Sequence, residues 1–121
     1  MSKQINNKEK VENMFVYGTL RHDKSRGNVL AELEYKEAIL PNHRKISPHN
    51  LGFPFIIQDE SSEVQGEVYF GLEDALIRKI DMIEGEGSLY NRIIVEVITE
   101  DGEQVKAYTY FPSERLVESY T

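Results

Sequence analysis

Apolar and polar positions along the chain predict several short strands joined by tight turns. Residues 14–17 form a short apolar run, and residues 64–70 alternate between apolar and polar positions as a half-buried strand does. The strand pattern returns at residues 93–99 and 105–111, after which Pro112 is expected to end the last strand and leave a polar tail. An Asp-Gly dipeptide lies between these last two runs and is typical of a hairpin turn.

Weaker patterns fill the middle of the chain. Residues 35–40 are expected to form a strand that ends at the following proline, with a further short strand near residues 44–46. Residues 55–57 are a short apolar run, and the polar segment 59–62 that follows them predicts a turn. Residues 28–34 predict a short helix.

The clearest helix is predicted for residues 73–83. At about 100° per residue, one apolar side of this helix is formed by Leu76, Ile77, Ile80 and Ile83. Asp81 falls outside that side, whereas Glu84, one residue beyond the helix, falls within it. Gly85 follows at the position where a glycine commonly closes a helix, and Glu73 at the start is expected to act as a cap.

Glu84 is therefore a carboxylate directed toward the apolar core. An unpaired buried carboxylate is costly, so it needs a partner, a water molecule or a proton. A glutamate that exchanges a proton near neutral pH suits general acid–base catalysis. Two structural alternatives stay open: the helix ends earlier and leaves Glu84 in solvent, or Glu84 forms a salt bridge with Arg92.

The end of the first predicted strand is the second candidate site. Tyr17 is followed by Gly18, Thr19 and Leu20, whose successive N–H groups have the potential to form a concave nest for an anion such as a carboxylate. The alternative is an ordinary turn after a strand. Tyrosines near such sites more often pack in a core or rim than take part in catalysis.

Composition limits the classes of protein that fit these patterns. The 121 residues suffice for one domain, expected over residues 13–121 after a flexible polar tail at 1–12. Helices and strands do not alternate regularly, so the sequence predicts an α+β fold, a small mixed β-barrel of about six strands with one or two packed helices.

Charge and cysteine content exclude further classes. The net charge is −7 and no block of Lys or Arg occurs, which argues against a nucleic-acid or anionic-membrane surface. No cysteine is present, and the three histidines lack close metal-ligand spacing, so we expect no metal site. The first residues lack the apolar stretch of a signal peptide, and we expect a cytoplasmic protein.

Several segments, read together, resemble the γ-glutamylcyclotransferase-like family. The resemblance covers roughly residues 14–111 in family order and rests on Val16-Tyr17-Gly18-Thr19-Leu20-Arg21, Gly52-Phe53-Pro54, Val64-Gln65-Gly66-Glu67-Val68-Tyr69, Ile80-Asp81-Met82-Ile83-Glu84-Gly85, Tyr90-Asn91-Arg92 and Val105-Lys106-Ala107-Tyr108-Thr109-Tyr110. The chain departs from the family at residues 22–28, which lack an Asn-His pair, at residues 35–38, which lack a glycine, and at Phe55, where a small residue is common.

The resemblance implies a barrel fold and release of 5-oxoproline and a free amine from a γ-glutamylamine or γ-glutamyl peptide. The nucleophile is the substrate's own α-amine, so no cofactor is implied. Glu84 would be the general acid and base, and the N–H groups of residues 18–20 would hold the substrate. The remaining residues implied are Tyr17, Pro54 and Tyr90 around the substrate, and Arg92 and Tyr110 as supporting groups.

A second interpretation belongs to a different class. A non-catalytic member of the same fold would keep the strand-end nest as a binding site for a small γ-glutamyl or carboxylate ligand, since a fold does not fix a function. Retention of Glu84 argues against it, because a pure binder gains nothing from a carboxylate beside an acidic ligand. In both cases the partner is a small molecule, and the oligomeric state stays open.

Overall fold

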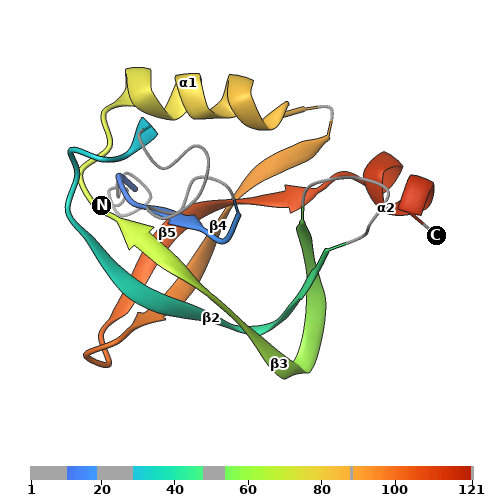
Figure 1. Ribbon diagram of the computed structural model, residues 1–121, viewed down its shortest axis with the longest axis horizontal. Helices are drawn as coiled ribbons and strands as arrows, with labels where there is room; N and C mark the ends of the chain where they lie inside the picture. The colour runs from blue at the N-terminus through green and yellow to red at the C-terminus, as the bar shows by residue number, and fades with distance from the viewer. Residues whose placement is uncertain (1–10, 19–28, 48–53, 88, 121) are drawn as a thin grey trace, which may run out of the picture.

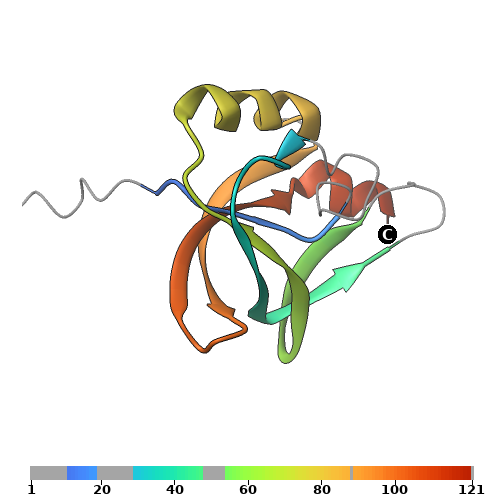
Figure 2. The same cartoon turned by 60° about the vertical axis from the view of Figure 1, so that its left-hand side comes forward.

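The computed structural model describes residues 11–18, 29–47, 54–87 and 89–120. Five strands close into a barrel in the order β1-β3-β2-β4-β5, and two helices lie outside it (Figures 1 and 2). The elements are β1 (Met14–Val16), β2 (Tyr35–Ile46), β3 (Phe55–Tyr69), α1 (Asp74–Glu84), β4 (Tyr90–Thr99), β5 (Gln104–Pro112) and α2 (Glu114–Tyr120).

The barrel is mixed, as predicted, because β1 pairs antiparallel with β3 and parallel with β5. It has five strands rather than about six, since the predicted strands 35–40 and 44–46 are one continuous strand, β2, and the runs 55–57 and 64–70 are both parts of β3. The predicted hairpin is confirmed: β4 and β5 pair along their length, and Gly102 adopts the positive φ of 86° that the turn requires.

A bulge interrupts the pairing of these two long strands, β2 and β3, and divides each of them into two halves. The β2–β3 pairing runs to Pro41 opposite Glu63 and resumes at His43 opposite Gln58, with Asn42 between them at a φ of 64°. The polar segment predicted as a turn is thus extra chain within β3, opposite a single residue of β2. A bulge of this kind bends both strands.

Alternate residues of the strands divide the apolar core in two. The barrel interior is filled by Phe15, Tyr17, Ala38, Leu40, Ile56, Val64, Val68, Val97 and Ala107. A second cluster contains the buried helix residues and consists of Met14, Val16, Leu30, Phe55, Tyr69, Leu72, Ile77, Ile80, Tyr90, Tyr110 and Leu116. The candidate site residues are therefore divided between the two clusters, with Tyr17 in the interior one.

Helix α1 ends as its sequence predicts. Glu84 is its last residue, and Gly85 follows in the left-handed conformation with a φ of 68°, its N–H donating to the carbonyls of Asp81 and Met82. Glu73 occupies the N-cap position, but its side chain makes no capping hydrogen bond, contrary to expectation.

Two expectations about helices are wrong. The described part of the predicted helix 28–34 forms turns, with the Leu33 N–H donating to the Leu30 carbonyl over 3.0 Å. The polar tail expected after Pro112 contains helix α2 instead. The hydroxyl of Ser113 accepts a hydrogen bond from the Leu116 N–H over 3.2 Å, and burial of Leu116 anchors this helix.

The end of the predicted tail joins the fold. Val11 is buried, and the carbonyl of Glu12 accepts a hydrogen bond from the Leu72 N–H over 2.8 Å. The rest of the predicted tail lies outside the described residues, and the division at residue 12 stays a prediction. No helix in the described part of the chain is both long enough and apolar enough to cross a membrane.

Replacing Gly66 by Ala should strongly destabilise the barrel. A Cβ atom there would lie 2.4 Å from the Val16 carbonyl oxygen and 2.8 Å from the ring of Phe15, so backbone must shift. We expect a loss of about 3 kcal/mol in the free energy of unfolding, measured by urea denaturation. Gly71→Ala is the control: its φ of 78° makes Ala cost about 1 kcal/mol, but nothing lies within 4 Å of the new atom. Equal losses for the two variants would contradict the proposed clash.

Candidate active site

Glu84 and three tyrosines come together where the end of α1 meets the barrel. Burial raises the pKa of the phenols of Tyr17, Tyr90 and Tyr110, and the negative charge of Glu84 raises the pKa of all three further. Glu84 itself is half-buried. The structure thus brings four of the sequence-predicted site residues within electrostatic range of one another, although they come from β4, β5, the end of β1 and the end of α1.

Each of the three phenols donates its single hydrogen bond to another part of the protein. Tyr17 Oη donates to the Tyr110 carbonyl over 2.6 Å, and Tyr90 Oη donates to the Pro54 carbonyl over 2.5 Å. Tyr110 Oη donates to Oδ1 of Asp81 over 2.6 Å. Because their pKa values are raised, the phenols stay protonated at neutral pH, and the three rings are fixed in place.

The strand-end loop approaches the same place. A Cβ atom added at Gly18 would lie 3.3 Å from Cγ of Pro54, so the loop backbone packs closely against this proline. The ammonium group of Lys45 donates to the Tyr17 carbonyl over 3.3 Å and fixes the preceding peptide. Thr19 and Leu20, which complete the predicted nest, lie outside the described residues.

Asp81 is a site residue that the sequence analysis missed. The helical pattern places it outside the apolar side, yet its side chain is only 18% exposed. Its Oδ1 atom accepts the hydrogen bond of Tyr110 and lies 3.2 Å from Nε of Arg92. The signal was present in the sequence, because Asp81 precedes Glu84 by three residues and such residues are neighbours on a helix.

Arg92 was expected to be a supporting group, with a salt bridge to Glu84 as the structural alternative. The ion pair that the structure shows for Arg92 is with Asp81, and its guanidinium carbon lies 4.4 Å from the centre of the Tyr108 ring. Arg92 therefore connects β4 and β5 to the last turns of α1. Its effect on Glu84 therefore passes through this ion pair and the helix, not through a salt bridge with Glu84.

Glu67 is a second acidic residue whose burial the strand pattern did not indicate. It lies on the polar side of the alternation in β3 but is only 3% exposed, and Tyr69 Oη donates to its Oε1 over 3.1 Å. Since Tyr69 belongs to the cluster that contains the helix residues, Glu67 faces that layer. Within the part of the chain that the structure describes, no group of three or more His, Asp or Glu side chains is arranged to hold a metal ion.

The fold is a small mixed barrel. Its candidate site consists of a carboxylate at the end of a helix, which faces phenols and a glycine loop at the end of a strand. The family model described as "Gamma-glutamyl cyclotransferase, AIG2-like" matches residues 14–120. The chain belongs to this family.

Individual proteins are also similar to this chain. Protein AIG2 C of Arabidopsis thaliana is 33% identical over 100 residues, which cover 81% of this chain and 59% of that protein. A protein of Methanocaldococcus jannaschii with the provisional name gamma-glutamylcyclotransferase is 31% identical over 115 residues, 90% of this chain and 93% of its own. The solution structure of an Arabidopsis thaliana protein matches with a TM-score of 0.74 and 27% identity, covering 91% of this chain and 74% of the other. The chain spans 58–59% of the length of two Arabidopsis relatives.

Replacing Asp81 by Asn should loosen the attachment of α1. The variant keeps an acceptor for Tyr110 but removes the charge that pairs with the half-buried Arg92, so we expect a loss of about 1–2 kcal/mol in the free energy of unfolding. Lys79→Gln, which removes an exposed charge from the same helix, should change this free energy by less than about 0.5 kcal/mol. Thermal and urea denaturation measure both. An Asp81→Asn protein as stable as the control would show that the ion pair does not hold the helix.

Proposed function

We propose that this protein is a γ-glutamyl cyclotransferase that releases 5-oxoproline and a free amine from a γ-glutamylamine. The observation that supports this best is the half-buried Glu84, whose charge acts on three protonated phenols beside the strand-end loop at Gly18. Membership of the γ-glutamyl cyclotransferase family supports the same reaction class.

The proposed reaction is an intramolecular aminolysis. The α-amino nitrogen of the γ-glutamyl group attacks its own γ-carbonyl carbon, a C–N bond closes the five-membered ring, and the bond from that carbon to the leaving amine breaks. The α-nitrogen enters as an ammonium group and ends as the single N–H of the lactam, so it loses two protons. The leaving nitrogen takes up two protons and departs as an ammonium ion. A single carboxylate is sufficient to carry these protons one after the other. The protein's task is to hold the substrate folded, since most of the rate gain comes from orientation and charge stabilisation.

Glu84 is the group proposed to carry the proton. Its position in the last turn of α1, half-buried beside three aromatic rings, keeps it near the reacting atoms and partly shielded from water. Asp81 and Arg92 are positioning residues, because their ion pair joins the same turn of helix to β4.

The oxyanion and the substrate's α-carboxylate need donors other than the phenols. Tyr17, Tyr90 and Tyr110 each have one O–H group, and each donates it within the protein. We therefore assign these donors to the backbone N–H groups of residues 18–20, which follow β1 directly. The tyrosine rings then form the walls of the site.

The leaving group is proposed to be an amine rather than an amino acid. The Tyr-Gly-Thr-Leu form of the loop resembles that of the branch of the family that acts on γ-glutamylamines. Phe55, which differs from the residue common in the family, is only 1% exposed and belongs to the same cluster as Tyr90 and Tyr110. Its bulk therefore lies in the apolar cluster that also contains these two rings.

Glu84→Gln should abolish turnover while leaving the fold intact. The amide keeps the shape of the side chain but cannot accept the α-ammonium proton, so 5-oxoproline release should fall by about 100- to 10,000-fold, the range that general acid–base catalysis contributes. The assay uses γ-glutamyl-ε-lysine, γ-glutamyl alkylamines, γ-glutamyl-alanine and glutathione. Glu73→Gln, at the other end of α1 and without a capping bond, is the matched control and should retain full activity.

The outcomes of this assay separate the proposal from its alternative. Release of 5-oxoproline by the wild-type protein and the Glu73 variant, but not by the Glu84 variant, supports the cyclotransferase. Substantial activity in Glu84→Gln overturns the assignment of the proton carrier. Binding of the substrates without release, measured by thermal shift, would favour a binding module of the same fold.

Tyr90→Phe tests whether a phenol donates to the oxyanion. Its O–H group already binds the Pro54 carbonyl, so we expect kcat to fall by less than about tenfold and KM to rise as the wall of the site loosens. Loss of a true oxyanion donor costs about 100- to 1,000-fold in kcat. A loss in that range, with KM unchanged, would contradict the backbone assignment.

A further inference from the structure

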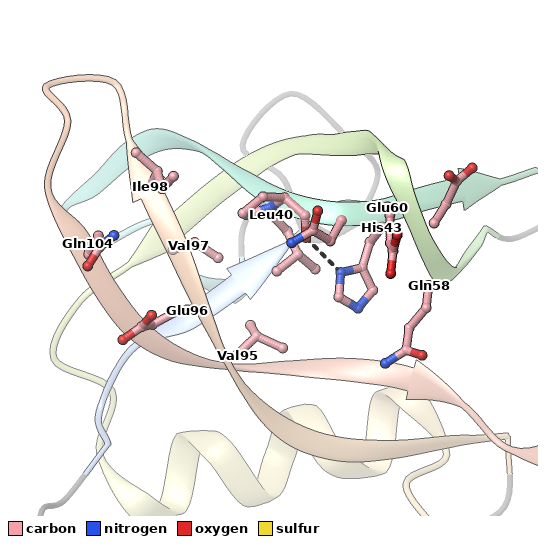
Figure 3. A pocket seen from close by; sticks show the side chains of 12 residues that line it. Leu40, His43, Gln58, Glu60, Val95, Glu96, Val97, Ile98 and Gln104 are labelled. Carbon is pink, nitrogen blue, oxygen red and sulfur yellow. Dashed lines mark hydrogen bonds between the residues drawn. The ribbon is translucent and has the colours of Figure 1, made fainter.

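The bulge in β2 decides which of its side chains face the inside of the barrel. Successive residues of a strand face opposite sides, and before the bulge Ala38 and Leu40 face the interior cluster. Asn42, at a φ of 64°, interrupts this alternation. Beyond it, the His43 ring points into the space between the β2–β3 and β4–β5 pairs, where it lines a cavity of about 740 Å³ (Figure 3). The inward positions of β2 therefore change from even-numbered to odd-numbered residues.

Lys45 is directed inward by this change. It is the register partner of Ile56, which is 0% exposed and belongs to the cluster that fills the barrel. Register partners in an antiparallel pair project to the same side of the sheet, so the side chain of Lys45 leaves β2 on the inner side. Without the bulge, alternation from Leu40 would place it on the outer side. A local break in β2 thus brings a cation to the end of β1.

The ammonium group of Lys45 holds one particular peptide plane. Its Nζ atom donates to the carbonyl oxygen of Tyr17 over 3.3 Å. That carbonyl belongs to the peptide unit that links Tyr17 to Gly18, the first residue of the strand-end loop, and no described peptide bond is cis. In a trans peptide unit the C=O and the N–H point in opposite directions. Fixing the carbonyl on the side of Lys45 therefore directs the N–H of Gly18 away from Lys45.

The other end of this peptide unit is held by packing. A Cβ atom at Gly18 would lie 3.3 Å from Cγ of Pro54, and Pro54 is itself held by the hydrogen bond from Tyr90 Oη to its carbonyl over 2.5 Å. A charged donor therefore fixes the carbonyl end of the unit and a proline fixes the glycine end. Because Tyr17 is within electrostatic range of Glu84, this peptide unit lies on the side of the site where the proposed proton carrier is placed.

A positive charge at a carbonyl oxygen also changes the donor strength of the same peptide unit. It draws electron density away from the amide nitrogen, and hydrogen bonds linked in a chain polarise one another in this way. The N–H of Gly18 then carries more positive charge than that of an ordinary amide. A preorganised donor of this kind is suited to an oxyanion that develops in the transition state.

We propose that Lys45 is a positioning residue of the cyclotransferase: it orients and polarises the peptide unit between Tyr17 and Gly18, whose N–H donates to the oxyanion formed from the γ-carbonyl. This inference rests on the function proposed above. Lys45 does not touch the substrate, and its effect reaches the reacting atoms through one peptide unit. Removing it should therefore weaken stabilisation of the transition state and leave substrate binding unchanged.

Lys45→Met is tested first on 5-oxoproline release, because it keeps most of the aliphatic stem and removes the charged donor. Loss of an oxyanion donor costs about 100- to 1,000-fold in kcat. Here the donor stays but is weaker and less well directed, so we expect kcat to fall about tenfold and KM to change by less than about twofold. Lys45→Arg, which restores a charged donor, should recover most of kcat. Lys79→Met, which removes an exposed charge from α1, is the control and should have no effect.

A second measurement does not depend on turnover. A charged hydrogen bond at a carbonyl moves the amide resonance of the following residue downfield, so the Gly18 resonance of the ¹⁵N-labelled protein should move upfield in Lys45→Met. It should stay in place in Lys79→Met, and the Gly71 resonance should not move in either variant. Retained dispersion of the spectrum and an unchanged thermal midpoint show that each variant is folded.

The outcomes separate this inference from the proposed function. A lower kcat with unchanged KM, recovery by arginine and an upfield Gly18 resonance together support it. It is overturned if Lys45→Met turns over like Lys79→Met, if KM rises while kcat stays constant, if arginine does not restore kcat, or if the Gly18 resonance does not move. A rise in KM alone would place Lys45 on the substrate's carboxylate instead. Absence of 5-oxoproline release by the wild-type protein overturns the proposed function itself, and this inference with it.

Discussion

The carboxylate of Asp81 is the contact on which the candidate site depends. Burial of Ile77 and Ile80 supplies most of the attraction between α1 and the barrel, about 1.5–3 kcal/mol for each side chain, but apolar contact does not fix the rotation of a helix. The bonds from Tyr110 and Arg92 to Oδ1 of Asp81 do fix it, because they join the helix to two different strands. Glu84, three residues further, takes its direction from them.

The strands of the barrel are paired more extensively on one side than on the other. On the side of the candidate site, β4 and β5 are paired along nine positions, and three phenols cross-link neighbouring segments through hydrogen bonds. On the other side, β2 and β4 share two register pairs and diverge around a cavity. The first arrangement suits a reaction that depends on orientation.

The elements predicted correctly are those whose cause is local. The period of the apolar residues predicts α1, and the glycine after Glu84 predicts where it ends. An Asp-Gly pair between two alternating runs predicts the hairpin of β4 and β5. The failures concern segments whose state depends on distant contacts. Residues 29–34 lack a helical structure despite a weak pattern, and α2 forms because Leu116 is buried. Burial of Leu116 depends on the rest of the fold, so the capping serine before α2 did not by itself predict this helix.

The sequence by itself determined the fold class, the end of α1 and the position of Glu84 in its last turn. Only the tertiary structure decided that Asp81 is half-buried and pairs with Arg92, and that the hydroxyls of Tyr17, Tyr90 and Tyr110 are donated within the protein. It also decided that a cavity lies beside His43. The physical reason is that periodicity reports which side of an element is apolar. It does not report which polar side chain of another element meets it, because that depends on how the strands bend and close.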